Sequence, residues 1–185
     1  GELGAVTPRA QAGNEKPRVW RHIEEEALQN AFGFNNDGVA VIANRLDKIY
    51  PFVLPLAMNI GKNKTTPDEE AINDYKILVE KLKDKIDFFI VNVSSPNTPN
   101  LRKLLNEEFI GGLFKELKTI TQKPILIKLS PDMDLDLAVN VAKIAVQNGA
   151  NGVVATNTSV DYSLVKNPQN RGGISGKVLK EKSYK

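Results

Sequence analysis

Cysteine is absent from all 185 residues. This excludes a disulfide framework, a cysteine-ligated zinc or iron–sulfur site and a thiol nucleophile. No apolar run approaches the roughly 18 residues that span a bilayer, and the first residues lack the basic and apolar segments of a signal peptide. Neither sign of charge dominates, since 25 Lys and Arg stand against 22 Asp and Glu. Because there is also no basic stripe interleaved with aromatics, we expect no nucleic-acid binding.

The composition that remains is that of an ordinary globular domain, with 41% hydrophobic and 25% charged residues. The length suffices for one domain with a proper core. Gly1–Thr7 begins in what reads as a strand, and Leu179–Lys185 reads as a helix that has barely begun. We therefore expect an internal fragment of a single domain.

Four short apolar runs are predicted to be strands. Most of them are apolar on both faces, which is typical of parallel strands buried on both sides. They cover residues 52–60, 88–93, 124–129 and 152–156, and residues 5–7 look like the end of a further strand.

Helical patterns separate these strands. Thr66-Pro67-Asp68-Glu69 has the spacing of a capping box with proline at the first helical position. Asn106 and Asp134 are predicted N-caps of two later helices, the second ending at Gly149. Another helix is expected over residues 39–50. The predicted inward-facing residues are Ile42, Leu46 and Ile49, then Ile72, Tyr75, Val79, Leu82 and Ile86, then Phe109, Leu113, Leu117 and Ile120, and finally Leu137, Val141 and Ile144.

This alternation of strands and helices at a period of roughly 30 residues indicates an α/β fold with right-handed crossovers. An open doubly wound sheet and a closed (β/α)8 barrel both fit it. No Gly-x-Gly-x-x-Gly or Walker sequence follows any strand, which weakens the open nucleotide-binding sheet.

Polar residues recur where the strands end. A single Asn or Ser after a strand is most often turn chemistry, but recurrence at four strands favours a pocket, because parallel strands of a barrel open on one face. Amide side chains offer donors and an acceptor in one plane, which suits a flat, amide-like heterocycle. The residues are Asn59; Asn92, Ser94, Ser95 and Asn97; Lys128; and Thr156, Asn157 and Thr158.

Lys128 is the single residue that most strongly indicates a binding site. It lies between Ile127 and Leu129 in an apolar run, where burial is costly without an anionic partner. A bound anionic group such as a reduced flavin would supply that partner. The alternative is that the side chain extends to the surface.

Together these segments closely resemble the class 2 dihydroorotate dehydrogenase family. The most specific stretch is Asn92-Val-Ser-Ser-Pro-Asn-Thr-Pro99. The matching stretches occur in family order and cover nearly the whole chain: 4–18, 28–36, 59–64, 92–102, 127–132, 155–158 and 172–176.

The resemblance implies an α/β (β/α)8 TIM barrel, incomplete, with about strands 2–6 of eight. It also implies oxidation of dihydroorotate to orotate in pyrimidine biosynthesis, with FMN taking the hydride and a membrane quinone reoxidising it. Ser95 would be the base that removes the C5 proton, although serine needs a relay or a tuned environment for that role. Class 1 enzymes have Cys at this place, so Ser95 favours class 2.

The resemblance also implies two sets of binding residues and no metal site. Ala5 stands where the family often has a small hydroxyl residue, which leaves that position only a backbone contact with the flavin. The implied FMN contacts are Ala5, Asn59, Asn92, Lys128, Thr156 and Gly176. The implied substrate contacts are Asn30, Ala31, Phe32, Gly33, Phe34, Asn92, Asn97, Asn157 and Thr158.

By the same resemblance, residues 1–185 are the central part of one FMN-binding barrel domain. The membrane-docking N-terminal segment and the last two strands, which bind the FMN phosphate, are expected outside it. The implied location is peripheral, on the cytoplasmic side of a bacterial inner membrane or on a mitochondrial inner membrane. We expect the 185 residues alone to bind FMN weakly or not at all.

Two alternatives stay open on the sequence. One is a class 1 dihydroorotate or dihydropyrimidine dehydrogenase that uses another electron acceptor, and the other is a barrel fragment that binds without catalysing. His22, the only histidine, reads as a surface residue at a helix start, and Glu24–Glu26 reads as a solvated helix face.

Overall fold

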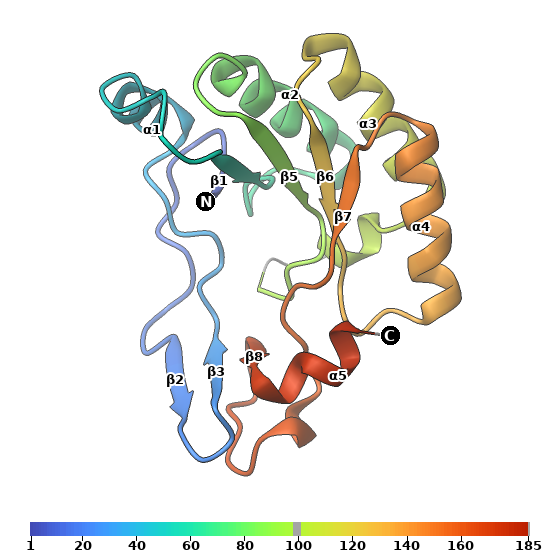
Figure 1. Ribbon diagram of the computed structural model, residues 1–185. Coiled ribbons are helices and arrows are strands. Elements are labelled where there is room, and N and C mark those ends of the chain that lie inside the picture. Colours follow the sequence, from blue (N-terminus) through green and yellow to red (C-terminus); the bar gives the residue numbers. More distant parts are fainter. Residues whose placement is uncertain (98–100, 185) are drawn as a thin grey trace.

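A computed structural model describes residues 1–97 and 101–184 of the chain, and its central feature is a five-stranded parallel sheet (Figure 1). The strands follow one another in sequence order across the sheet. They are β1 (Glu2–Val6), β4 (Ala57–Ile60), β5 (Phe88–Asn92), β6 (Ile125–Lys128) and β7 (Gly152–Val154).

The helices form a layer on one side of this sheet, each packed on the next along the chain (Figure 1). A doubly wound sheet reverses its strand order and carries helices on both faces, whereas a barrel keeps sequence order with its helices outside. The arrangement is therefore that of a partial (β/α) barrel. The helices are α1 (Val39–Leu46), α2 (Ala71–Leu82), α3 (Glu107–Ile120) and α4 (Leu135–Gln147).

The core lies between the sheet and the helix layer. Tyr75, Leu82, Leu113 and Phe114 are fully buried there against the strands. Burial of such side chains is worth roughly 1.5–3 kcal/mol each before entropy is counted. The predicted inward faces of α2 and α3 are confirmed, with Ile72, Phe109 and Ile120 partly buried and Ile86 buried just past the end of α2.

The N-caps of α3 and α4 are confirmed. The side chain of Asn106 accepts from the Phe109 N–H, and that of Asp134 accepts from the N–H groups of Asp136 and Leu137. Gly149 follows α4 with φ +110°, a conformation that favours glycine.

The predicted capping box before α2 is wrong. Residues 68–70 form a 3-10 turn instead, and no side chain caps the start of α2. The Thr66 hydroxyl accepts a 3.0 Å hydrogen bond from the Arg9 guanidinium. The Thr66 side chain is thus engaged by a residue 57 positions away along the chain.

Three boundary and facing predictions are also wrong. Residues 52–56 are not a strand, since Pro51 and Pro55 lack the N–H that a sheet ladder needs. Ile49 is 53% exposed because α1 ends at Leu46, shortly before Pro51. Leu137, in the first turn of α4, is 43% exposed, although Val141 one turn later is buried.

A second, antiparallel sheet lies at the end of the molecule toward which β5, β6 and β7 run (Figure 1). It consists of β2 (Val19–His22), β3 (Ala27–Asn30) and β8 (Gly173–Gly176). The prediction of a helix around His22 is wrong, because residues 19–30 form a hairpin. His22 is 8% exposed, and its Nε2 lies 3.2 Å from the Gln29 side-chain oxygen. A short helix α5 (Lys180–Ser183) follows β8.

Candidate functional site

A polar cavity of about 350 Å³ opens where the parallel strands end. It brings together Ser95 and every predicted substrate residue except Ala31, which is buried and faces a neighbouring cavity. The lining residues are Gly4, Ala5, Asn30, Phe32, Gly33, Phe34, Asn35, Asn92, Ser95, Asn97, Asn157 and Thr158.

A second cavity, of about 400 Å³, adjoins the first. Lys128, Thr156 and Gly176, which are predicted cofactor residues, lie in its wall. Asn157 and Thr158 belong to the walls of both cavities. Two ligands in these cavities would therefore contact the same short segment after β7.

A chain of amide hydrogen bonds connects three strand ends. Asn92 Nδ2 donates to Asn59 Oδ1 over 3.1 Å, and Asn157 Nδ2 donates to Asn92 Oδ1 over 3.1 Å. Asn157 Nδ2 also lies 3.0 Å from the hydroxyl of Ser94, which donates to the Lys128 carbonyl. Asn59 and Asn92 are 5% and 6% exposed, so these bonds fix the amide planes in a setting where water competes little.

Lys128 has a protein partner that the sequence did not indicate. Its Nζ lies 3.2 Å from Glu2 Oε1, and the same oxygen accepts from Asn59 Nδ2 over 2.8 Å. The Lys128 side chain is 19% exposed, so it neither reaches fully into solvent nor stays unpaired. Lys128 is also opposite Asn92 in the register of β5 and β6.

Ser95 is 5% exposed in the wall of the first cavity. Its hydroxyl oxygen accepts a 3.3 Å hydrogen bond from the Asn97 N–H. A donor aimed at this oxygen favours its negatively charged form. The Asn97 side chain in turn donates to Asn30 Oδ1 over 3.2 Å, which ties the segment after β5 to the antiparallel sheet.

Arg102 joins three of the loops around the site. Its guanidinium donates to the carbonyls of Ser94 and Thr158, at 2.9 and 3.0 Å, and to the carboxylate of Asp132 at 3.0 Å. Burial raises the pKa of Asp132, but hydrogen bonds from Ser159, the Val160 N–H and Arg102 outweigh it, so the pKa lies below its ordinary value.

Tyr75 supports the floor of the site from α2. Its fully buried hydroxyl donates to the Asn92 carbonyl over 3.0 Å. Burial raises the pKa of Tyr75 far above its ordinary value, so the hydroxyl stays protonated and remains a donor.

Two features of the cavity walls favour a ligand that comes close to the backbone and forms a hydrogen bond with Thr158. The Thr158 hydroxyl is buried and has no hydrogen-bond partner among the described residues, and such a group is costly unless a ligand or water pairs with it. A Cβ on Gly173 would lie only 1.9 Å from this hydroxyl. A flat ligand with polar edges fits these features.

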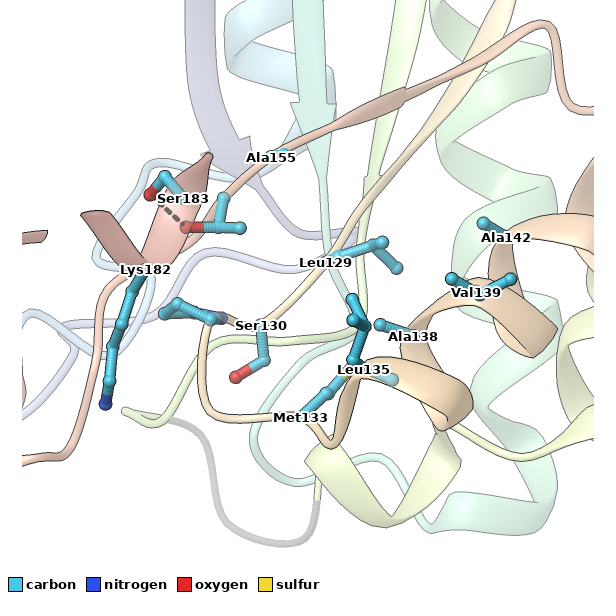
Figure 2. A pocket seen from close by; sticks show the side chains of 12 residues that line it. Leu129, Ser130, Met133, Leu135, Ala138, Val139, Ala142, Ala155, Lys182 and Ser183 are labelled. Atoms are coloured by element: carbon cyan, nitrogen blue, oxygen red, sulfur yellow. Dashed lines mark hydrogen bonds between the residues drawn. The ribbon is translucent and has the colours of Figure 1, made fainter. Parts of the chain in front are cut away.

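A third cavity, of about 390 Å³, is mostly apolar and is a different kind of feature (Figure 2). Met133, Leu135 and Val139 face it from the α4 side, and Lys182 and Ser183 lie on the other (Figure 2). It lies between α4, the segments that follow β6 and β7, and α5. We assign it no ligand.

Within residues 1–97 and 101–184, no helix is long and apolar enough to cross a membrane. The same residues contain no group of three or more His, Asp or Glu side chains placed to hold a metal ion. Residues 98–100 of the Asn92–Arg102 stretch lie outside the described residues.

Sequence reasoning missed the charged residues that support the site. Arg102 and Asp132 stand inside motifs that matched the family, but spacing along the chain did not show that they meet. The available signal for Glu2 was a charged residue in a segment expected to be a strand. Its contacts are 57 and 126 residues away, so only folding reveals them.

Comparisons with known proteins agree with this geometry. A model of the family described as dihydroorotate dehydrogenase matches residues 1–185. Proteins named dihydroorotate dehydrogenase (quinone) from Nautilia profundicola and Sulfurimonas denitrificans are 66% and 58% identical over 184 and 183 residues. These alignments cover 100% and 99% of this chain but 51% and 52% of those proteins, so the chain spans about half the length of the curated relatives it matches.

Solved structures give the same result. The ligand-free DHODH of Eimeria tenella superposes with a TM-score of 0.89 at 28% identity, covering 98% of this chain and 58% of that one. The same protein in complex with ferulenol gives a TM-score of 0.86 at 28% identity, covering 98% and 56%. The solved structures match over 98% of the chain and the family model over residues 1–185, so the chain belongs to the dihydroorotate dehydrogenase family.

Proposed function

We propose that the protein containing this chain oxidises dihydroorotate to orotate in pyrimidine biosynthesis, with FMN as hydride acceptor and a membrane quinone as final oxidant. The observation that carries the proposal is the pair of adjoining cavities with a shared wall at Asn157 and Thr158. Ser95 lies in one cavity and Lys128 in the other, as a reaction between two flat rings requires.

The substrate is assigned to the first cavity. Dihydroorotate loses a proton from C5 and a hydride from C6, which creates the ring double bond of orotate. Ser95 is the proposed base for the C5 proton, and the hydrogen bond from the Asn97 N–H favours negative charge on its oxygen. Asn30, Asn92, Asn97, Asn157 and Thr158 offer donors and acceptors for the ring and its carboxylate.

FMN is assigned to the second cavity, where it would accept the hydride when bound. Lys128 places positive charge near the ring that gains electrons, while Thr156 and Gly176 lie in the same wall. Asn92, which lines the first cavity, donates a hydrogen bond to Asn59. Asn59 lines neither cavity, so its proposed role toward FMN is exerted through Asn92 and Glu2. Ala5, a predicted FMN contact, lines the first cavity and not the second, and it has no side-chain donor, so only its backbone could contact a ligand.

Quinone is proposed as the electron acceptor because the relatives above carry that name. We propose that the protein associates peripherally with the cytoplasmic side of a bacterial inner membrane, or with the mitochondrial inner membrane in a eukaryote. Fractionation tests this: the protein should sediment with membranes and be released by mild detergent. Turnover with fumarate or a nicotinamide, and none with quinone analogues, would refute quinone as the electron acceptor.

The decisive experiment for the chemistry is Ser95→Ala in the full-length gene product. We expect turnover of dihydroorotate to fall about 10²–10⁴-fold, the range of general-base contributions, while bound FMN and its visible spectrum persist. Ser163→Ala is the matched control, because Ser163 is exposed in the 3-10 turn Tyr162–Leu164 and its backbone and hydroxyl donate to Asp161. Near-normal turnover of Ser95→Ala would refute the base, and a colourless wild-type protein would refute the whole proposal.

A further inference from the structure

Glu2 makes contacts that require it to lie on the inner face of the sheet. It belongs to β1, whereas Lys128 belongs to β6, and β4 and β5 lie between these strands. A distance of 3.2 Å between Glu2 Oε1 and Lys128 Nζ is possible only if the sheet curves and both side chains point into its concave side. The carboxylate of Glu2, whose side chain is 38% exposed, therefore lies on the same concave face as the lysine assigned to the cofactor.

Glu2 also determines how the neighbouring amides are oriented. An ionised carboxylate only accepts hydrogen bonds, so Asn59 must turn its Nδ2 toward Glu2 and its Oδ1 toward Asn92. Asn92 must then donate to Asn59 and offer its own oxygen to Asn157. One carboxylate thus fixes the direction of a three-amide chain that ends at the shared wall of the two cavities.

The same carboxylate compensates the charge of Lys128. With Glu2 in place, its carboxylate offsets part of the positive charge that Lys128 presents to the second cavity. With an amide at position 2, the ammonium would face that cavity uncompensated, and in a partly buried site this difference is felt more strongly than in water.

We propose that Glu2 is a positioning residue that holds Lys128 and Asn59 and lowers the reduction potential of the flavin bound beside them. This inference rests on the proposed function, because it assumes that the second cavity holds FMN. Glu2 contacts neither ligand in this scheme and acts through Lys128 and Asn59.

The test is the midpoint potential of bound FMN in the full-length gene product, measured by spectroelectrochemistry for wild type, Glu2→Asp and Glu2→Gln. Loss of the negative charge favours reduced over oxidised flavin. For Glu2→Gln we expect a gain of about tenfold in that preference, which raises a two-electron potential by about 30 mV. Glu2→Asp keeps the negative charge but moves it away from Lys128, because aspartate is one methylene shorter. Its potential should therefore lie between those of wild type and Glu2→Gln.

Glu116→Gln is the matched control, because it removes the same charge from the ion pair with Lys76 on the helix layer. Its potential should equal that of wild type. A Glu2→Gln potential equal to wild type, or a Glu2→Asp potential as high as that of Glu2→Gln, would overturn the inference. If Glu2→Gln does not fold, the Glu2→Asp protein provides the test. A Glu2→Asp potential equal to that of wild type then overturns the inference.

The two levels of proposal fail in different ways. A wild-type protein without FMN contradicts the proposed function. A wild-type protein that binds FMN and oxidises dihydroorotate, but whose potential is insensitive to Glu2, contradicts only the role of Glu2.

Discussion

Replacing Arg102 with methionine should loosen three loops of the site at once. Methionine keeps an apolar stem of similar length but removes the donors to the Ser94 carbonyl, the Thr158 carbonyl and Asp132. The side chains of Arg102 and Asp132 are 26% and 17% exposed, so the pair is more than a surface salt bridge. Lys182, at 3.5 Å, remains as a weaker partner for Asp132.

The magnitude follows from these contacts. Hydrogen bonds to charged groups contribute about 1.5–3 kcal/mol, and removing one partner of a buried pair costs about 3–5 kcal/mol. Because this pair is partly exposed and Asp132 keeps other partners, we expect a loss of about 2–4 kcal/mol of unfolding free energy. The relatives are about twice as long as this chain, and at about 2.1 cal/mol/K of unfolding entropy per residue this loss lowers the Tm of a protein of that size by about 3–5 °C.

The assays are thermal unfolding and steady-state kinetics of the full-length gene product. Since the Ser94 carbonyl adjoins Ser95, kcat should fall along with Tm. Arg45→Met is the control, because Arg45 pairs with Asp37 over 2.7 Å at an exposed site, and such pairs contribute little. An Arg102→Met protein with the Tm and kcat of wild type would refute the proposal that Arg102 holds the three loops of the site together.

The pH dependence of stability gives a second test. The folded-state pKa of Asp132 lies below its ordinary value, so the folded protein binds fewer protons here than the unfolded chain does. The stability from this group is therefore present above the unfolded pKa, about 3.9, and is lost as pH falls through the lower folded pKa. The difference between wild type and Arg102→Met should shrink below about pH 4. A stability difference between wild type and Arg102→Met that is constant from pH 7 to pH 3 would contradict the lowered pKa of Asp132.

Two further predictions follow from the walls of the site. Tyr75→Phe should cost about 1–3 kcal/mol in urea unfolding, because it leaves the Asn92 carbonyl buried without this donor; an unchanged midpoint would contradict that. Gly173→Ala should raise the KM for dihydroorotate more than it lowers kcat, because its Cβ would displace the Thr158 side chain from a distance of 1.9 Å. An unaltered KM would show that Thr158 does not contact the substrate.

Local patterns in the sequence determined most of the elements. The N-caps at Asn106 and Asp134 and the apolar faces of α2 and α3 depend on residues three or four apart, so they can be predicted without the fold. The hairpin at residues 19–30 could not, because its strands have only four residues each, half of them polar, and β3 gains its second neighbour from β8, almost 150 residues later.

The site divides in the same way. Polar residues at strand ends were evident from the sequence and predicted Ser95, Asn92, Asn157 and Lys128 as neighbours of one pocket, whereas the alternation of strands and helices left the strand order open. Only the tertiary structure decided that Glu2 is the partner of Lys128 and that Arg102 joins three loops. Both depend on the curvature of the sheet, which brings side chains from non-adjacent strands and loops within hydrogen-bonding distance, and no sequence spacing encodes that distance.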